Sequence, residues 1–209
     1  ISRLKRTQPT IAVGIMSATG IEFSLADAKK RTASFKDGRI EYDGKLHDEL
    51  IFKAPASSSL FAEPSFTLYG VTIGVKFHWE RQEDQTFAGD LKIIVDGNRL
   101  LAINIIGVED YLLSVISSEM SATASEEFLK AHAVISRSWV MARVDAHPET
   151  VIPADPFNLP ELITWLYATR ETAVRTGDEY IKTYDHQDHK LFDVCADDHC
   201  QRYQGLTRA

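Results

Sequence analysis

The stretch of residues 108–143 constrains this chain most, because it predicts two amphipathic helices joined by a short polar turn. The first helix carries an apolar stripe at helical spacing, made of Tyr111, Leu112, Val115 and Ile116. One carboxylate, Glu119, lies where this pattern stops, just before the polar run SATAS. Thr123 and Glu126 then have the spacing of a capping box, which predicts the start of the second helix.

The second helix is predicted to have one apolar face and one charged flank. The expected apolar face is formed by Phe128, Ala131, Ile135, Trp139 and Ala142. Lys130 and Arg137 are two helical turns apart, so they project from a common side of this helix. An acid at a helix end followed by two aligned cations indicates a polar site, although on spacing alone a solvated charged face is the simpler interpretation.

The chain before these helices predicts a β-rich scaffold. The expected strands are residues 10–16, 21–25, 33–36, 39–42, 50–54, 66–79, 91–95 and 99–106. Asp37-Gly38 and Asp96-Gly97 mark hairpin turns, and Gly70 or Gly74 is expected to kink the longest strand. These segments contain no clustered Cys, His or paired carboxylates, so we expect them to form scaffold and not a site.

The segment after the second helix predicts a loop and a further helix. Residues 147–160 contain most of the chain's seven prolines, which indicates a loop. Residues 161–175 have Leu162, Trp165 and Leu166 near helical spacing and predict a helix that ends before Gly177. We interpret residues 146–185 as an insertion packed on the side of the domain.

Composition limits the classes of function. The 209 residues are enough for one domain with a real core, and the net charge of −7 without any basic tract argues against a nucleic-acid partner. No apolar run is long enough to span a membrane, and no signal peptide begins the chain. Because Ile1 is not an initiator methionine, we expect that an N-terminal segment, such as an export signal, has been removed.

The C-terminal region concentrates soft ligands: both cysteines, Cys195 and Cys200, with His186, His189 and His199. A disulfide, a metal site and a cysteine nucleophile are the competing interpretations. Two close cysteines fit a nucleophile poorly. The spacing of His189, Cys195 and Cys200 is not that of a standard zinc finger, so the residues alone leave disulfide and metal open.

The runs YLLSVISSEM and LKAHAVISRSW, and the later run FDVCADDHCQRYQG at residues 192–205, resemble the signature blocks of the SpoIID/LytB family. This family comprises stage II sporulation protein D and its relatives, and the blocks occur here in the family's order. The resemblance implies one SpoIID-like domain over residues 1–209, of class α+β, in which a β-rich scaffold carries a two-helix catalytic segment and an inserted helix. Its expected parts are residues 1–106 (β-rich), 107–145 (catalytic helices), 146–185 (insertion) and 186–209 (Cys/His motif), after which relatives usually continue.

The resemblance also implies a chemistry. SpoIID-type proteins are lytic transglycosylases that cleave the MurNAc-GlcNAc β-1,4 bond of peptidoglycan strands stripped of stem peptides, and leave a 1,6-anhydroMurNAc end. The 6-hydroxyl of muramic acid attacks instead of water, so one carboxylate can act where other glycosidases need two. Glu119 matches the family's EM motif and is expected to be that acid and base. The family also includes amidase enhancers, so the alternative is a non-catalytic, glycan-binding modifier of a cell-wall amidase.

Matches to family positions extend the expected site. Substrate contacts are expected from Lys130, Arg137, Ser138, His199 and Tyr203. Some relatives hold a zinc ion with one His and two Cys, which favours a structural zinc site here over a disulfide. Its expected ligands are His189, Cys195 and Cys200, with His186 as a candidate fourth. The expected partners are peptidoglycan glycan strands and a cell-wall amidase, and the expected location of this exported protein is the bacterial cell envelope, in the periplasm or wall.

Overall fold

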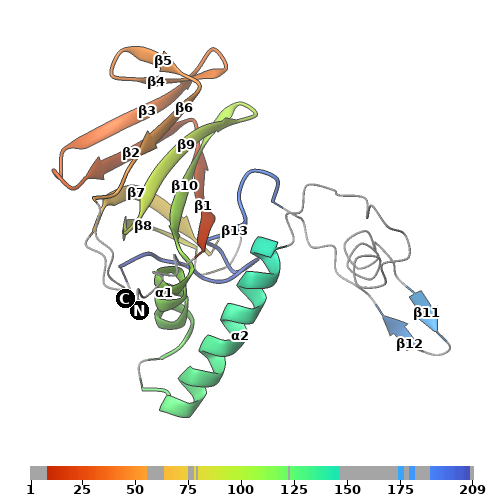
Figure 1. Cartoon of the computed structure of the whole chain (residues 1–209). Helices are drawn as coiled ribbons and strands as arrows, with labels where there is room; N and C mark the ends of the chain where they lie inside the picture. The colour runs from red at the N-terminus through yellow and green to blue at the C-terminus, as the bar shows by residue number, and fades with distance from the viewer. Residues whose placement is uncertain are drawn as a thin grey trace, which may run out of the picture.

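The structure is a computed structural model that describes residues 9–55, 64–74, 78, 80–121, 123–145, 174–176, 179–181 and 189–207. Two larger β-sheets lie above two helices in the view of Figure 1. This arrangement confirms the predicted α+β class and its β-rich scaffold. No helix in the described part of the chain is both long and apolar enough to cross a membrane.

The first large sheet has five strands in the order β13-β1-β10-β9-β6. They are β1 (Thr10–Ala18), β6 (Glu49–Phe52), β9 (Asp90–Asp96), β10 (Arg99–Gly107) and β13 (Val194–Cys195). The strands β1, β10, β9 and β6 pair in antiparallel fashion. In contrast, β13 pairs with β1 in parallel, with Val194 beside Val13 and Cys195 beside Gly14. The C-terminal strand thereby adds a distant part of the chain to the edge of this sheet.

The second large sheet has six antiparallel strands in the order β5-β4-β3-β2-β7-β8. They are β2 (Gly20–Leu25), β3 (Lys30–Lys36), β4 (Arg39–Tyr42), β5 (Lys45–His47), β7 (Phe66–Ile73) and β8 (Arg81–Phe87). The predicted kink in β7 falls at Gly70, whose φ is 67° and where the register with β8 shifts. The strand β8 was not predicted, because its sequence RQEDQTF is polar: it lies at the sheet edge with most of its first residues exposed.

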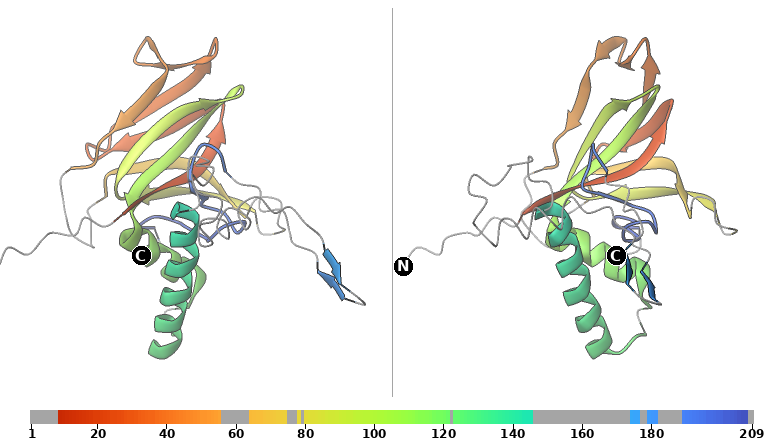
Figure 2. Two further views of the ribbon diagram at one scale, coloured as in Figure 1. Left: turned by 45° about the vertical axis from the view of Figure 1, so that its right-hand side comes forward. Right: turned by 90° about the vertical axis from the view of Figure 1, so that its right-hand side faces the viewer.

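The two sheets share one hydrophobic core. Side chains from both sheets are 0% exposed in it, among them Val13, Ile21, Phe23, Leu68, Ile93 and Leu100. The helices lie together at one end of the sheets in all three views (Figures 1 and 2). The core therefore forms a rigid base from which the helical segment starts.

The helix α1 (Val108–Glu119) follows β10 directly. Its predicted apolar stripe is confirmed, because Tyr111, Leu112 and Val115 are at most 3% exposed. The backbone N–H of Val108 donates to the carbonyl of Pro9 (3.0 Å), which ties the start of α1 to the chain just before β1. The last residue of α1 is Glu119.

The helix α2 (Glu126–Asp145) begins differently from the prediction. Ser125, and not Thr123, is the capping residue: its Oγ accepts a hydrogen bond from the backbone N–H of Phe128 (3.4 Å). The Oγ1 of Thr123 lies 2.7 Å from the Oγ of Ser121 instead. The predicted capping box is therefore wrong, because Glu126 is already the first helical residue.

Most of the predicted apolar face of α2 is also not its packed face, although Trp139 packs against the core. Phe128 and Ile135 are 50% and 66% exposed, whereas Ser136 and Val140 are 2% and 0% exposed. The packed side carries polar groups such as His132 and Ser136, which have partners there. Apolar spacing alone could not show this, because the helix turns a mixed face inward.

The insertion is described only at its C-terminal end. There β11 (Val174–Thr176) and β12 (Glu179–Ile181) form an antiparallel pair. Val174 and Arg175, the last two residues of the predicted helix, belong to this pair, so the predicted helix end is wrong. The rest of that helix, the proline-rich loop and the packing of residues 146–173 lie outside the described residues.

Two glycines with positive φ permit a matched test of the scaffold: Gly89 in the connection from β8 to β9, and Gly97 in the hairpin of β9 and β10. Gly89 (φ 82°) would bring an added Cβ against the backbone carbonyl oxygen of Ile105, whereas Gly97 (φ 58°) has no described heavy atom within 4 Å. We expect Gly97→Ala to cost about 1 kcal/mol, because alanine disfavours a positive φ. Gly89→Ala should cost about 3 kcal/mol or more, because it adds a clash with backbone to the same strain. Urea unfolding followed by circular dichroism measures both, and equal losses would contradict this account.

Candidate functional site

The C-terminal block, defined here as residues 189–207, joins the five-stranded sheet to the helices (blue segment around β13 in Figure 1). Its first half extends the pairing of β13 with β1. The backbone N–H groups of Asp193 and Ala196 each donate to β1 carbonyls, those of Ala12 and Gly14, over 2.9 Å. The carboxylate of Asp193 accepts the backbone N–H of Ala12 (2.7 Å). This half of the block is therefore fixed by the sheet.

The second half of the block packs on α1. The ring of Tyr203 stacks on that of Tyr111, with centroids 5.1 Å apart. The hydroxyl of Tyr111 donates to Oε1 of Gln201 (3.2 Å), and the backbone N–H of Gln204 donates to Oγ of Ser114 (3.3 Å). Burial raises the pKa of both tyrosine hydroxyls, so they act as neutral donors.

This packing places the carboxyl group of Glu119 where three segments meet. Its Oε1 accepts the backbone N–H of Arg202 in the block (3.0 Å). Its Oε2 lies 2.9 Å from Nε2 of His132 on α2. The Glu119 side chain remains 25% exposed, against 14% for His132. The carboxyl group is thus held at both oxygens, while a quarter of the Glu119 side chain stays accessible to solvent.

Sequence reasoning missed His132 and the backbone N–H of Arg202. His132 lies inside the run KAHAV, and a single histidine in a predicted helix gives no sign that it faces a carboxylate one helix away. The N–H of Arg202 leaves no trace in sequence at all, because every residue except proline carries one. Both contacts with Glu119 form only when α2 and the block pack around the end of α1.

The expected cations do not lie beside Glu119. Nζ of Lys130 pairs with Glu126 (2.8 Å) and Glu127 (3.1 Å) on its own helix. The guanidinium of Arg137 pairs with Glu109 on α1, with Nε 3.0 Å from Oε1. These carboxylates raise the pKa of both cations.

Helical geometry explains this placement. At about 100° per residue, Lys130 lies about 160° around the helix from His132, and Arg137 about 140°. The two cations share one side of α2, as predicted, but it is nearly opposite the side that contacts Glu119. Among the described contacts, neither cation reaches the acid.

Two further residues that were expected to contact substrate form hydrogen bonds within the protein. Oγ of Ser138 donates to the backbone carbonyl of Val134, one helical turn earlier (2.8 Å). Tyr203 is 1% exposed, and its hydroxyl donates to Oδ1 of the buried Asn104 (2.6 Å). The structure places Tyr203 in the core and not on a surface where a glycan can contact it, because its ring fills the space between α1 and β8.

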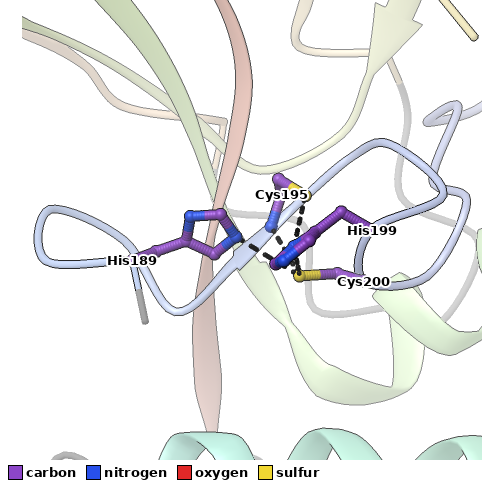
Figure 3. A group of neighbouring side chains, drawn as sticks. All are labelled: His189, Cys195, His199 and Cys200. Carbon is purple, nitrogen blue, oxygen red and sulfur yellow. Dashed lines mark hydrogen bonds between the residues drawn. The ribbon is translucent and has the colours of Figure 1, made fainter. Parts of the chain in front are cut away.

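His189, Cys195, His199 and Cys200 form a compact cluster (Figure 3). One ligand atom from each residue lies within 4.8 Å of all the others. Sγ of Cys200 is 3.4 Å from Nε2 of His189 and 3.5 Å from Nδ1 of His199. Sγ of Cys195 is 3.8 Å from Nδ1 of His199. Both cysteines are free thiols. His199, expected at the substrate, is therefore brought to the expected metal ligands, and His186 lies outside the described residues.

The cluster has the donor chemistry and spacing of a zinc site. Zn–S bonds of about 2.3 Å and Zn–N bonds of about 2.0 Å in a tetrahedron separate ligand atoms by about 3.3–3.8 Å. The three S···N separations in the cluster, 3.4–3.8 Å, match that range closely. A hydrogen bond from the Cys200 thiol lowers the pKa of Cys195 to about 4 and raises that of Cys200, so one thiolate is readily formed.

Neighbouring residues hold this cluster against β1. The ring of Phe192 stacks on that of His189, with centroids 4.4 Å apart. Gly14 leaves room for Phe192, because a Cβ there would lie 2.7 Å from the ring. A nearby cavity of about 70 Å³ is lined by Cys195, Gln85, Val71 and others. That volume suits a few water molecules and not a sugar, and of the described residues neither Glu119 nor His132 lines it.

The burial of Tyr203 generates a prediction. Tyr203→Phe should destabilise the protein by about 1–3 kcal/mol, because Oδ1 of Asn104 loses its donor in the core. It should leave binding to peptidoglycan unchanged at a temperature where the variant is folded. Thermal unfolding and a peptidoglycan pull-down measure the two effects. Tyr69→Phe, which removes a part-buried bond to Ser24, is the control with a smaller expected loss of stability.

Comparison with known proteins finds a family whose matched region includes both helices and the C-terminal block. A family model described as "SpoIID: Stage II sporulation protein" matches residues 96–209, which is more than half of the 209 residues. The match begins at the end of β9 and includes β10, both helices and the C-terminal block. Searches of curated proteins and of solved structures find no match for this chain. On the family match, the chain belongs to the SpoIID (stage II sporulation protein) family.

Proposed function

We propose that this protein is a peptidoglycan lytic transglycosylase that cleaves the MurNAc-GlcNAc β-1,4 bond of denuded glycan strands. One observation carries the proposal: the carboxyl group of the part-exposed Glu119 side chain is held at both oxygens where the two signature segments of the chain meet. The association of the SpoIID family with cell-wall lytic activity supports it. The protein would then act after export, in the bacterial cell envelope.

The proposed reaction needs one acid and no water. The protonated Glu119 donates its proton to the glycosidic oxygen as the bond from that oxygen to C1 of MurNAc breaks. The 6-hydroxyl oxygen of the same MurNAc bonds to C1, and the Glu119 carboxylate accepts the hydroxyl proton. The products are a free GlcNAc 4-hydroxyl and a 1,6-anhydroMurNAc end, and Glu119 regains its starting state. A single carboxyl group therefore performs both proton transfers, unlike the carboxylate pair of hydrolytic glycosidases.

We also propose a zinc ion at His189, Cys195, His199 and Cys200. The four donors and their spacing support this assignment over a disulfide. Four protein ligands leave no open position for water, as in structural zinc sites, so the ion would stabilise the fold of the block. The residues of this chain carry out the proton transfers, and the bound ion would fix the segment that ends in the N–H of Arg202.

A second candidate function is a glycan-binding enhancer of a cell-wall amidase. One observation favours it: Lys130, Arg137 and Tyr203 do not surround Glu119, so the acid lacks the expected neighbours for a bound glycan. The amidase would then be the partner that cleaves the wall. Product analysis separates the two candidates, because an enhancer alone forms no anhydro sugar.

The catalytic role of Glu119 is tested by Glu119→Gln. The variant keeps the shape of the side chain but cannot transfer a proton, so formation of anhydro sugars should fall by about 100- to 10,000-fold. Mass spectrometry of products from denuded glycan strands measures this. Glu109→Gln on the same helix is the matched control and should keep activity. Wild-type activity in Glu119→Gln would exclude the assignment, and no product from any form would favour the enhancer.

The zinc proposal is tested by elemental analysis. We expect about one zinc per chain, given the four protein ligands of a closed site. His189→Ala should lose the ion, whereas His47→Ala, a histidine outside the cluster, should retain it. After chelation and unfolding without reductant, both cysteines should titrate as free thiols. Unreactive thiols under these conditions would establish a disulfide and exclude the proposed site.

A further inference from the structure

The pair formed by His132 and Glu119 is not explained by the proposed proton transfers. Nε2 of His132 lies 2.9 Å from Oε2 of Glu119, although Glu119 alone can donate and accept the proton. Oγ of the buried Ser136 approaches the same nitrogen at 3.4 Å, a longer contact. The other ring nitrogen, Nδ1, is buried and has no hydrogen-bond partner among the described residues.

The surroundings of the two ring nitrogens determine which of them carries the proton. A proton on Nδ1 would be a buried donor without an acceptor, which is unfavourable. Nδ1 lacks a partner among the described residues in either tautomer, but a proton on Nε2 can be donated to Oε2 of Glu119, whereas a proton on Nδ1 would leave two acceptors facing each other at 2.9 Å. The favoured tautomer therefore carries its proton on Nε2. The ring then supplies a fixed donor to the carboxyl group, just as the backbone N–H of Arg202 does at Oε1.

Glu119 needs such donors because of its position. It is the last residue of α1, and its long side chain is 25% exposed. One hydrogen bond to Oε1 leaves the carboxyl plane free to turn about that contact. A second donor at Oε2, from a different helix, fixes the plane. Reaction rates depend steeply on such alignment, since small misplacements of a reacting group cost about 100-fold.

We propose that His132 is a positioning residue: it donates from Nε2 to Oε2 of Glu119 and thereby sets the orientation in which the acid meets the glycosidic oxygen. This inference rests on the proposed transglycosylase function. In this role His132 does not exchange protons with substrate. A different side chain that places an N–H at the same point should therefore replace it.

The test compares His132→Gln with His132→Leu. The amide of glutamine can place an N–H close to the position of Nε2, whereas leucine fills similar space without a donor. We expect His132→Leu to lower kcat by about 10- to 100-fold with little change in KM, because alignment and not binding is lost. His132→Gln should recover most of kcat. Wild-type kcat in His132→Leu overturns the proposal, and so does a glutamine variant as slow as the leucine variant, because the imidazole itself would then be required.

A second measurement does not depend on activity. Nitrogen NMR of the wild-type protein with labelled histidine should show the His132 proton on Nε2, with a signal that changes in Glu119→Gln. A proton on Nδ1 overturns the proposal. If wild-type protein forms no anhydro sugar, the proposed function fails, and the NMR result still decides whether His132 donates to Glu119.

Discussion

The parallel pairing of β13 with β1 is the constraint on which the rest of the site depends. A parallel pair cannot be closed by a tight turn, so the chain must return from a distance to reach the sheet edge. In this protein it returns after both helices, and β13 fixes Cys195 beside Gly14. The residues that follow are then carried from the sheet onto α1, where Tyr203 stacks on Tyr111. The site is assembled by this crossing of the block between sheet and helix.

One segment, the C-terminal block, both carries the Cys/His cluster and contacts Glu119. Cys200 belongs to the cluster, and the backbone N–H of Arg202, two residues later, donates to Glu119. The intervening Gln201 accepts a hydrogen bond from Tyr111, so this short run is fixed along its length. A metal ion held by the cluster would stiffen the start of the run. On our proposal, zinc therefore supports the acid through the backbone, without taking part in the reaction.

The two faces of α2 have separate roles. The side with His132 and Ser136 contacts Glu119 and the block, and the side with Arg137 is tied to α1 through Glu109. Between them, the helix leaves Phe128 and Ile135 exposed. Ion pairs at exposed positions contribute little stability, about 0–1 kcal/mol each. The position of α2 is therefore set mainly by its buried side, with Val140 in the core.

The sequence by itself determined the elements with strong local signals, and it indicated Glu119 as the candidate acid. Alternating strands, the Asp-Gly turns and the apolar stripe of α1 follow from periodicity and turn chemistry, and the signature runs identified the family. The edge strand β8 was not predicted, because its sequence is polar and most of its first residues are exposed. Only the tertiary structure decided which face of α2 is packed, that Tyr203 is buried, and that His132 meets Glu119. These features depend on contacts between segments far apart in the chain, and spacing along one helix carries no information about what the helix packs against.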